Sequence, residues 1–115
     1  MKMIKIIPDD KIRSIAVDFD GTLCEKAKFP AIGLPKIELI DYLREQREKG
    51  VKLILWTCRE GEHLKAAVEW CREYNLEFDS VNCNLKTCNL KTRKVVADIY
   101  IDDRACIPYW EDNNK

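Results

Sequence analysis

The sequence predicts an α/β fold: a Rossmann-like three-layer sandwich built on a mainly parallel central sheet. Short apolar runs alternate with segments of helical periodicity, which is the pattern of parallel strands joined by crossover helices. Acidic pairs follow the first and the last of these runs, where the ligand crevice of such a sheet lies. With 115 residues the chain has material for one core, so residues 1–115 are expected to form a single domain.

The first strand is expected within 12–17, where Ile15, Ala16 and Val17 form a continuous apolar run typical of a strand covered on both faces. Residues 8–11 have turn composition, so residues 3–7 are expected to form an extra antiparallel strand before the main one. Gly21 provides the backbone freedom for a sharp turn after the first strand.

Two helices and three more strands follow. Residues 36–49 carry apolar side chains at helical spacing between Pro35 and Gly50, and Leu64, Ala67, Val68 and Cys71 do so between Gly61 and Asn75. The remaining apolar runs predict strands at 51–56, at 78–81 and at 99–101, the last preceded by 95–97.

Between the last two strands the pentapeptide Cys-Asn-Leu-Lys-Thr occurs twice in succession, at 83–87 and 88–92. Two copies of five residues are too short for a solenoid, so we expect a loop or a short helical duplication. No acidic residue occurs from Ser80 to Ala97, whereas Lys86, Lys91, Arg93 and Lys94 do. An anion-facing loop and an ordinary solvated face are equally compatible with this bias.

Charge and cysteine content restrict the class of protein. The formal net charge is zero with no charged tail, so neither nucleic acid nor a membrane is indicated as a partner. Residues 1–7 are too short and too charged for a signal peptide, so a soluble cytoplasmic protein is the simplest interpretation. The six cysteines include no C-x-x-C pair, and we expect free thiols rather than disulfides or a zinc site.

Three strand ends carry related chemistry: Asp18-Phe19-Asp20-Gly21-Thr22, Trp56-Thr57-Cys58-Arg59 and Asp102-Asp103-Arg104. The C-terminal ends of parallel strands share one rim, so these loops are expected to meet. Side chains two residues apart in an extended backbone point the same way, which predicts that Asp18 and Asp20 face one ligand. Their adjacent charges favour a hard cation such as Mg²⁺, which prefers carboxylate and carbonyl oxygens.

This set of motifs resembles the haloacid dehalogenase (HAD) superfamily of phosphohydrolases over Ile15 to Arg104. The resemblance implies that Asp18 is the nucleophile that becomes phosphorylated, and that Asp20 is the general acid and base. It further implies that Mg²⁺ is held by the Asp18 carboxylate, the Asp20 carbonyl and Asp102, with Asp103 bound directly or through water.

The resemblance also assigns the groups around the phosphoryl oxygens. Thr57 would hydrogen-bond one of them and Lys94 would neutralise their charge, although Lys91 remains an alternative because a loop lysine reaches far. The candidate substrate contacts are Thr22, Cys58 and Arg59, and for Arg59 a solvated side chain is the commoner outcome after such a turn.

Members of that superfamily usually carry a cap domain, and the intervals 24–35 and 82–93 are too short for one, so no cap domain is expected. An open site suits a large phosphorylated substrate, or a small one enclosed by a homo-oligomer. The leading hypothesis is a Mg²⁺-dependent phosphatase of phosphate monoesters, with nucleotides favoured by the resemblance of 97–104 to the 5′-nucleotidase branch. The alternatives are a catalytically weak binding or regulatory domain, and a phosphatase of phosphoproteins or nucleic-acid ends.

Overall fold

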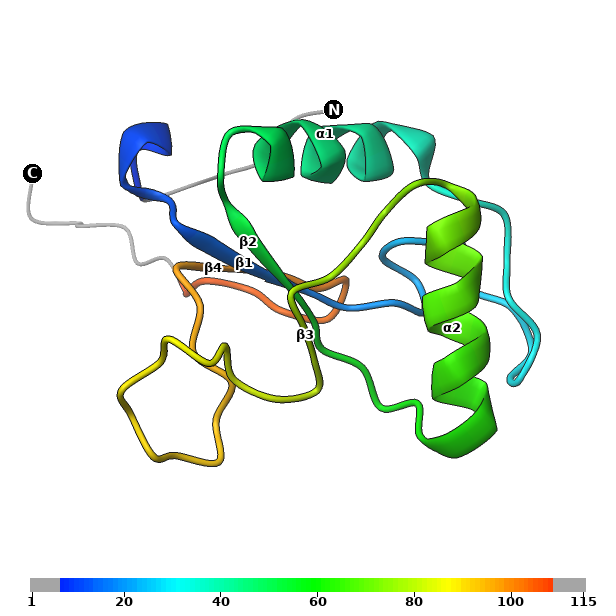
Figure 1. Ribbon diagram of the computed structural model, residues 1–115. Helices are drawn as coiled ribbons and strands as arrows, with labels where there is room; N and C mark the ends of the chain where they lie inside the picture. The colour runs from blue at the N-terminus through cyan, green and yellow to red at the C-terminus, as the bar shows by residue number, and fades with distance from the viewer. Residues whose placement is uncertain (1–6, 109–115) are drawn as a thin grey trace, which may run out of the picture.

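The computed structural model describes residues 7–108, and its centre is a parallel four-stranded sheet in the order β3-β2-β1-β4 (Figure 1). Val17 at the end of β1 is in register with Leu55 of β2 and with Ile101 of β4, so three strands end at the same level. This confirms the predicted α/β fold with a parallel sheet. The strands are β1 (Ser14–Val17), β2 (Lys52–Leu55), β3 (Ser80–Val81) and β4 (Ile99–Ile101).

Both helices, α1 (Ile37–Glu48) and α2 (Gly61–Glu73), pack on one face of the sheet. The side chains of Ile15, Val17, Leu53 and Leu55, which alternate along β1 and β2, belong to one buried cluster with residues of the helices. Those helix residues are Leu39, Ile40 and Leu43 of α1 and Ala67 and Cys71 of α2. Each strand–helix–strand connection places its helix on this same side, as right-handed crossovers require when successive strands extend the sheet in one direction.

The opposite face is covered by an irregular segment, residues 82–98, rather than by a helix. Val95 is buried there against Ala16 and Ile54, and Leu85 packs against the same cluster. The third layer of the sandwich is therefore a loop, seen below the sheet in Figure 1. The two copies of the pentapeptide differ accordingly, because Leu85 of the first copy is partly buried whereas Leu90 of the second is exposed.

The first three strands are shorter than the apolar runs predicted, and a polar side chain accounts for this at the start of β3. Asp79 accepts a hydrogen bond from the Leu53 amide at 2.9 Å, so strand pairing with β2 begins only at Ser80. The chain therefore enters β3 later than hydrophobicity indicates. Asp98 accepts from the Arg13 and Ser14 amides at 2.6 and 3.2 Å directly before β4, which spans residues 99–101 as predicted.

The start of the chain is described only in part. The predicted turn at 8–11 contains a short 3-10 helix, η1 (Asp9–Lys11), immediately before the strand. The extra strand predicted at residues 3–7 falls mostly outside the described residues and stays a prediction. Within residues 7–108, no helix has the length and apolar character needed to cross a membrane.

Candidate metal site and active site

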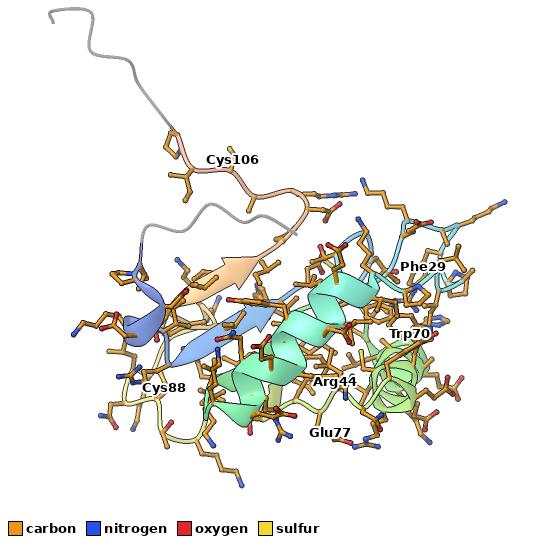
Figure 2. All side chains as sticks on the ribbon, turned by 90° about the horizontal axis from the view of Figure 1, so that it is seen from above. Phe29, Arg44, Trp70, Glu77, Cys88 and Cys106 are labelled. Carbon is orange, nitrogen blue, oxygen red and sulfur yellow. The ribbon has the colours of Figure 1, made fainter. Side chains whose placement is uncertain are left out.

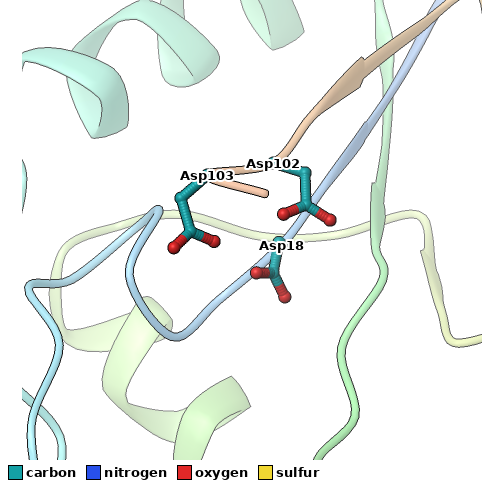
Figure 3. A group of neighbouring side chains, drawn as sticks. All are labelled: Asp18, Asp102 and Asp103. Carbon is teal, nitrogen blue, oxygen red and sulfur yellow. The ribbon is translucent and has the colours of Figure 1, made fainter. Parts of the chain in front are cut away.

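Three carboxylates converge where β1 and β4 end (Figure 3). Asp18 directly follows β1, Asp102 and Asp103 directly follow β4, and the Asp18 amide donates to the Ile101 carbonyl at 2.9 Å. One carboxylate oxygen from each aspartate lies within 4.8 Å of the others, which is the spacing needed for ligands of one cation. The parallel register brings together residues that are more than eighty positions apart in the sequence.

The surroundings of Asp18 oppose its ionisation. Burial is the largest cause, and it raises the pKa of Asp18 from the ordinary 3.8 to about 6. The charges of Asp102, Asp103 and Asp20 act in the same direction, while a hydrogen bond from the Phe19 amide acts against them. A bound cation would offset both the burial and the like charges, so the donor set and its electrostatics fit Mg²⁺.

Asp103 is held in place by Thr22 and Lys26. The Thr22 hydroxyl accepts from the Asp103 amide at 3.1 Å and donates to Asp103 Oδ1 at 3.4 Å, and Lys26 Nζ lies 3.4 Å from Asp103 Oδ2. Burial tends to raise the pKa of Asp103, but the hydrogen bond and charge of Lys26 outweigh it, so the pKa lies below its ordinary value. The substrate contact predicted for Thr22 stays a prediction. In this structure the Thr22 hydroxyl supports Asp103.

Gly21 and Lys26 are site residues that the sequence reasoning did not assign to Asp103. Gly21 has a φ of +81°, and a Cβ added there would meet Asp103 Oδ2 at 2.6 Å. The residue is therefore required both by its backbone conformation and by the close approach of the carboxylate. For Lys26, sequence contained no signal, because its contact depends on how the loop after β1 folds back.

The Asp20 carboxylate lies outside the group formed by Asp18, Asp102 and Asp103, and the prediction that it faces one ligand together with Asp18 stays a prediction. Both Asp20 oxygens accept from Arg59, Oδ2 from Nε and Oδ1 from Nη2, each at 2.8 Å. After Asp20 the chain turns at residues 21–23, where the Phe19 carbonyl accepts from the amides of residues 22–24. The metal contact expected of Asp20 is through its backbone carbonyl and stays a prediction.

The solvated arginine expected at position 59 is wrong. Arg59 is 2% exposed, and besides Asp20 its guanidinium donates to the carbonyls of Pro30 and Ala31 at 3.1 and 3.2 Å. With its nitrogens engaged in these bonds, Arg59 binds protein groups in this structure. Its ion pair with Asp20 raises the pKa of Arg59 further above the ordinary value.

The second rim loop, after β2, is held by Asn82. The Asn82 side chain accepts from the Thr57 amide at 2.8 Å and donates to the Arg59 carbonyl at 3.3 Å. The Thr57 hydroxyl accepts from the Arg59 amide at 3.2 Å, which leaves its own hydrogen to donate to a phosphoryl oxygen. Asn82 has a left-handed φ of 53°, which asparagine tolerates, and that preference after a strand was the signal available in the sequence. Cys58 is exposed on the same loop, and its substrate contact stays a prediction.

Lys94 is exposed, and its Nζ lies 5.4 Å from the centre of the Tyr100 ring rather than in an ion pair with the three aspartates. Tyr100 and Asp102 are two residues apart across the end of β4, which by strand alternation places them on the same face. The predicted role of Lys94 stays a prediction.

The cysteines differ in burial, with Cys24 and Cys71 buried in the core. All six, which lie within the described residues, are free thiols as predicted. Burial raises the pKa of Cys71 to about 12 and also raises that of Cys24, so these two behave as small apolar side chains.

Comparison with solved structures places this fold in a family. The chain is similar to a structure described as that of a conserved protein coded by a locus from Bacteroides thetaiotaomicron, with 42% sequence identity and a TM-score of 0.73. The match covers 84% of this chain and 82% of that one, so the chain belongs to the same family as that protein. The name of that protein states no activity. Comparisons with protein-family models and with curated proteins gave no match.

Proposed function

We propose that this protein is a Mg²⁺-dependent phosphatase that hydrolyses phosphate monoesters through an aspartyl-phosphate on Asp18, as a capless HAD-like enzyme. The observation that carries the proposal is the convergence of Asp18, Asp102 and Asp103 within 4.8 Å at the ends of β1 and β4. Bound there, Mg²⁺ would neutralise charge on the phosphoryl group and on the carboxylates around it.

The chain supplies the groups for both half-reactions. An Asp18 oxygen attacks phosphorus, the ester P–O bond breaks, and Asp20 gives a proton to the departing oxygen. A water then attacks the phosphoryl group, the bond to Asp18 breaks and Asp20 takes up a proton of the water, so alcohol and phosphate leave and the enzyme is restored. The Thr57 hydroxyl and Lys94 are proposed to hold the phosphoryl oxygens. Nucleotides remain the favoured substrates, and an open rim also admits larger phosphorylated molecules.

A binding or regulatory domain is the second candidate, and one observation favours it. Each oxygen of Asp20 accepts a hydrogen bond from Arg59, so the proposed general acid already has a structural partner within the protein. Such a domain would bind Mg²⁺ at the three carboxylates without turnover.

The test is release of p-nitrophenol from p-nitrophenyl phosphate in Mg²⁺ and in EDTA. We expect Mg²⁺-dependent turnover by the wild type, and a loss of at least about a thousandfold in Asp18→Asn because the nucleophile is gone. Asp41→Asn is the matched control, since Asp41 is exposed on α1 and pairs with Arg44. Mg²⁺ binding without turnover would favour the binding domain, and equal turnover by Asp18→Asn would refute the mechanism.

A further inference from the structure

We propose that Arg59 is the positioning residue for Asp20. Arg59, itself held by the loop at 29–31, fixes the Asp20 carboxylate in the position from which Asp20 exchanges protons with the leaving group and the attacking water. The inference rests on the proposed phosphatase function and adds a residue to it. Arg59 acts through Asp20 and has no direct contact with substrate in this proposal.

The first support is the geometry of the ion pair. Arg59 Nε and Nη2 each donate to a different oxygen of Asp20 at 2.8 Å, so the planar guanidinium defines both the distance and the orientation of the carboxylate. An aspartate on a turn without such a partner populates several staggered rotamers. A misplacement of about 1 Å at a reacting group costs about a hundredfold in rate.

The second support is the burial of the arginine and the number of groups that hold it. The Arg59 side chain is 1% exposed, and its Nη1 and Nη2 also donate to the carbonyls of Pro30 and Ala31. Its Cζ lies 5.1 Å from the ring centres of both Phe19 and Phe29. A buried charge with this many compensating contacts is fixed in position. Figure 2 shows Phe29 at the end of the molecule where α2 and Trp70 lie, and the Phe29 ring contacts His63 of α2.

The third support is that Asp20 remains accessible. Its side chain is 41% exposed although the guanidinium that binds it is buried. Arg59 therefore holds the carboxylate from the protein side and leaves the other side open to solvent and substrate. Asp20 is separated from Asp18 only by Phe19, which is fully buried and packs on Trp70 with ring centres 5.4 Å apart. The two aspartates are thus joined by an anchored residue.

The test compares substrates with different leaving groups. Departure of an alkoxide from n-propyl phosphate needs a proton from Asp20, whereas nitrophenolate departs from p-nitrophenyl phosphate with little help. Lysine cannot make the two-point contact. For Arg59→Lys we expect kcat on the alkyl phosphate to fall about a hundredfold and kcat on the aryl phosphate to fall about tenfold or less. A merely structural role would lower both by the same factor.

Coupling to Asp20 gives the second readout. In an Asp20→Asn background, Arg59→Lys is expected to cost little more, because the group that it positions is already absent. Phe29→Leu serves if Arg59→Lys does not fold: Phe29 is 59% exposed, and its replacement is expected to give a smaller loss with the same dependence on leaving group. Arg44→Lys, a surface substitution on α1, is the control expected to leave both activities unchanged.

The outcomes separate the two proposals. Equal losses on both substrates, or losses that add to those of Asp20→Asn, would overturn the positioning role while leaving the phosphatase intact. A gain on the alkyl phosphate would also overturn it, since it would mean that Arg59 withdraws Asp20 from the reaction. A wild type without Mg²⁺-dependent release from either ester would overturn the phosphatase proposal and this inference with it.

Discussion

Replacing Asp18 by asparagine is expected to stabilise the metal-free protein at neutral pH. The fold opposes ionisation of Asp18 through burial and through the charges of Asp102, Asp103 and Asp20. At pH 7 the wild type nevertheless carries a carboxylate there, because its pKa of about 6 lies below the pH. Asparagine has nearly the same shape without the charge, so the variant avoids the electrostatic penalty. The stability lost at this position is what the proposed Mg²⁺ would restore by offsetting the charge.

The sign and the size of the effect follow from the pKa. The folded value, about 6, is above the ordinary 3.8, so between these values the folded state binds more protons than the unfolded state. The free energy of unfolding therefore falls as the pH rises from about 3.8 to about 6, and the loss is complete above that window. The rise in the pKa of Asp18 corresponds to a loss of about 3 kcal/mol in the free energy of unfolding, since a pKa difference of one is worth about 1.36 kcal/mol. Solvent screens a half-buried carboxylate, which reduces the expected loss to about 1.5 kcal/mol. For a domain of this length that is about 6 °C in Tm.

The assay is thermal unfolding in EDTA between about pH 4 and pH 8 for the wild type, Asp18→Asn and the control Asp41→Asn. We expect the Tm difference between Asp18→Asn and the wild type to be small near pH 4 and to reach its full value above about pH 6. Saturating Mg²⁺ at pH 7 is expected to raise the Tm of the wild type and of the control more than that of Asp18→Asn. Parallel pH profiles for the wild type and Asp18→Asn would refute the electrostatic reasoning.

Three further predictions concern the support of Asp103 and are checked by calorimetric titration with Mg²⁺. Gly21→Ala is expected to weaken Mg²⁺ binding at least about tenfold, because the added Cβ displaces Asp103 Oδ2. Gly50→Ala is the control, since Gly50 has a similar φ of +94° but open space around it, and its Mg²⁺ affinity is expected to stay unchanged. Equal affinities of the two variants would contradict this prediction. Thr22→Val removes the hydroxyl that bonds the Asp103 amide and carboxylate, and we expect about tenfold weaker binding, with unchanged affinity as the contrary result. Lys26→Ala removes a positive charge that would compete with Mg²⁺ for Asp103, so we expect tighter Mg²⁺ binding. Because the Lys26 side chain is 68% exposed, the gain is expected to be no more than about fivefold. Weaker Mg²⁺ binding would show that Lys26 supports the site.

The parts of the fold that local sequence determines were predictable. The helix expected at 36–49 is α1 at Ile37–Glu48, and the one expected between Gly61 and Asn75 is α2 at Gly61–Glu73. Both follow from spacing of apolar residues and from the glycines at their ends. The meeting of Asp18 with Asp102 also followed, because parallel strands that alternate with helices must end at one rim.

The environment of Arg59 was not predictable, because it depends on three segments that are separate in the sequence. Its acceptors come from Asp20, Pro30 and Ala31, and its ring contacts come from Phe19 and Phe29. From sequence alone an arginine after a strand is usually solvated, since a buried charge needs several partners that no local pattern reveals. The loop from 24 to 36 provides three of these partners, namely Phe29, Pro30 and Ala31.

The choice between Lys94 and Lys91 shows what the structure adds where the sequence leaves two candidates. The backbone at Lys94 is fixed by Asn84, whose side chain bonds the Lys94 carbonyl at 3.1 Å and the Val96 amide at 2.6 Å, and by the buried Val95 beside it. Its amine rests on the Tyr100 ring, a contact of about 0.5–1 kcal/mol at an exposed site, which is weaker than a charge-assisted bond to a phosphoryl oxygen. Lys91 follows the exposed Leu90 and has no such anchor among the described residues. A substrate phosphate near Asp102 would therefore draw Lys94 from the ring at small cost, whereas Lys91 would have to order its loop as well.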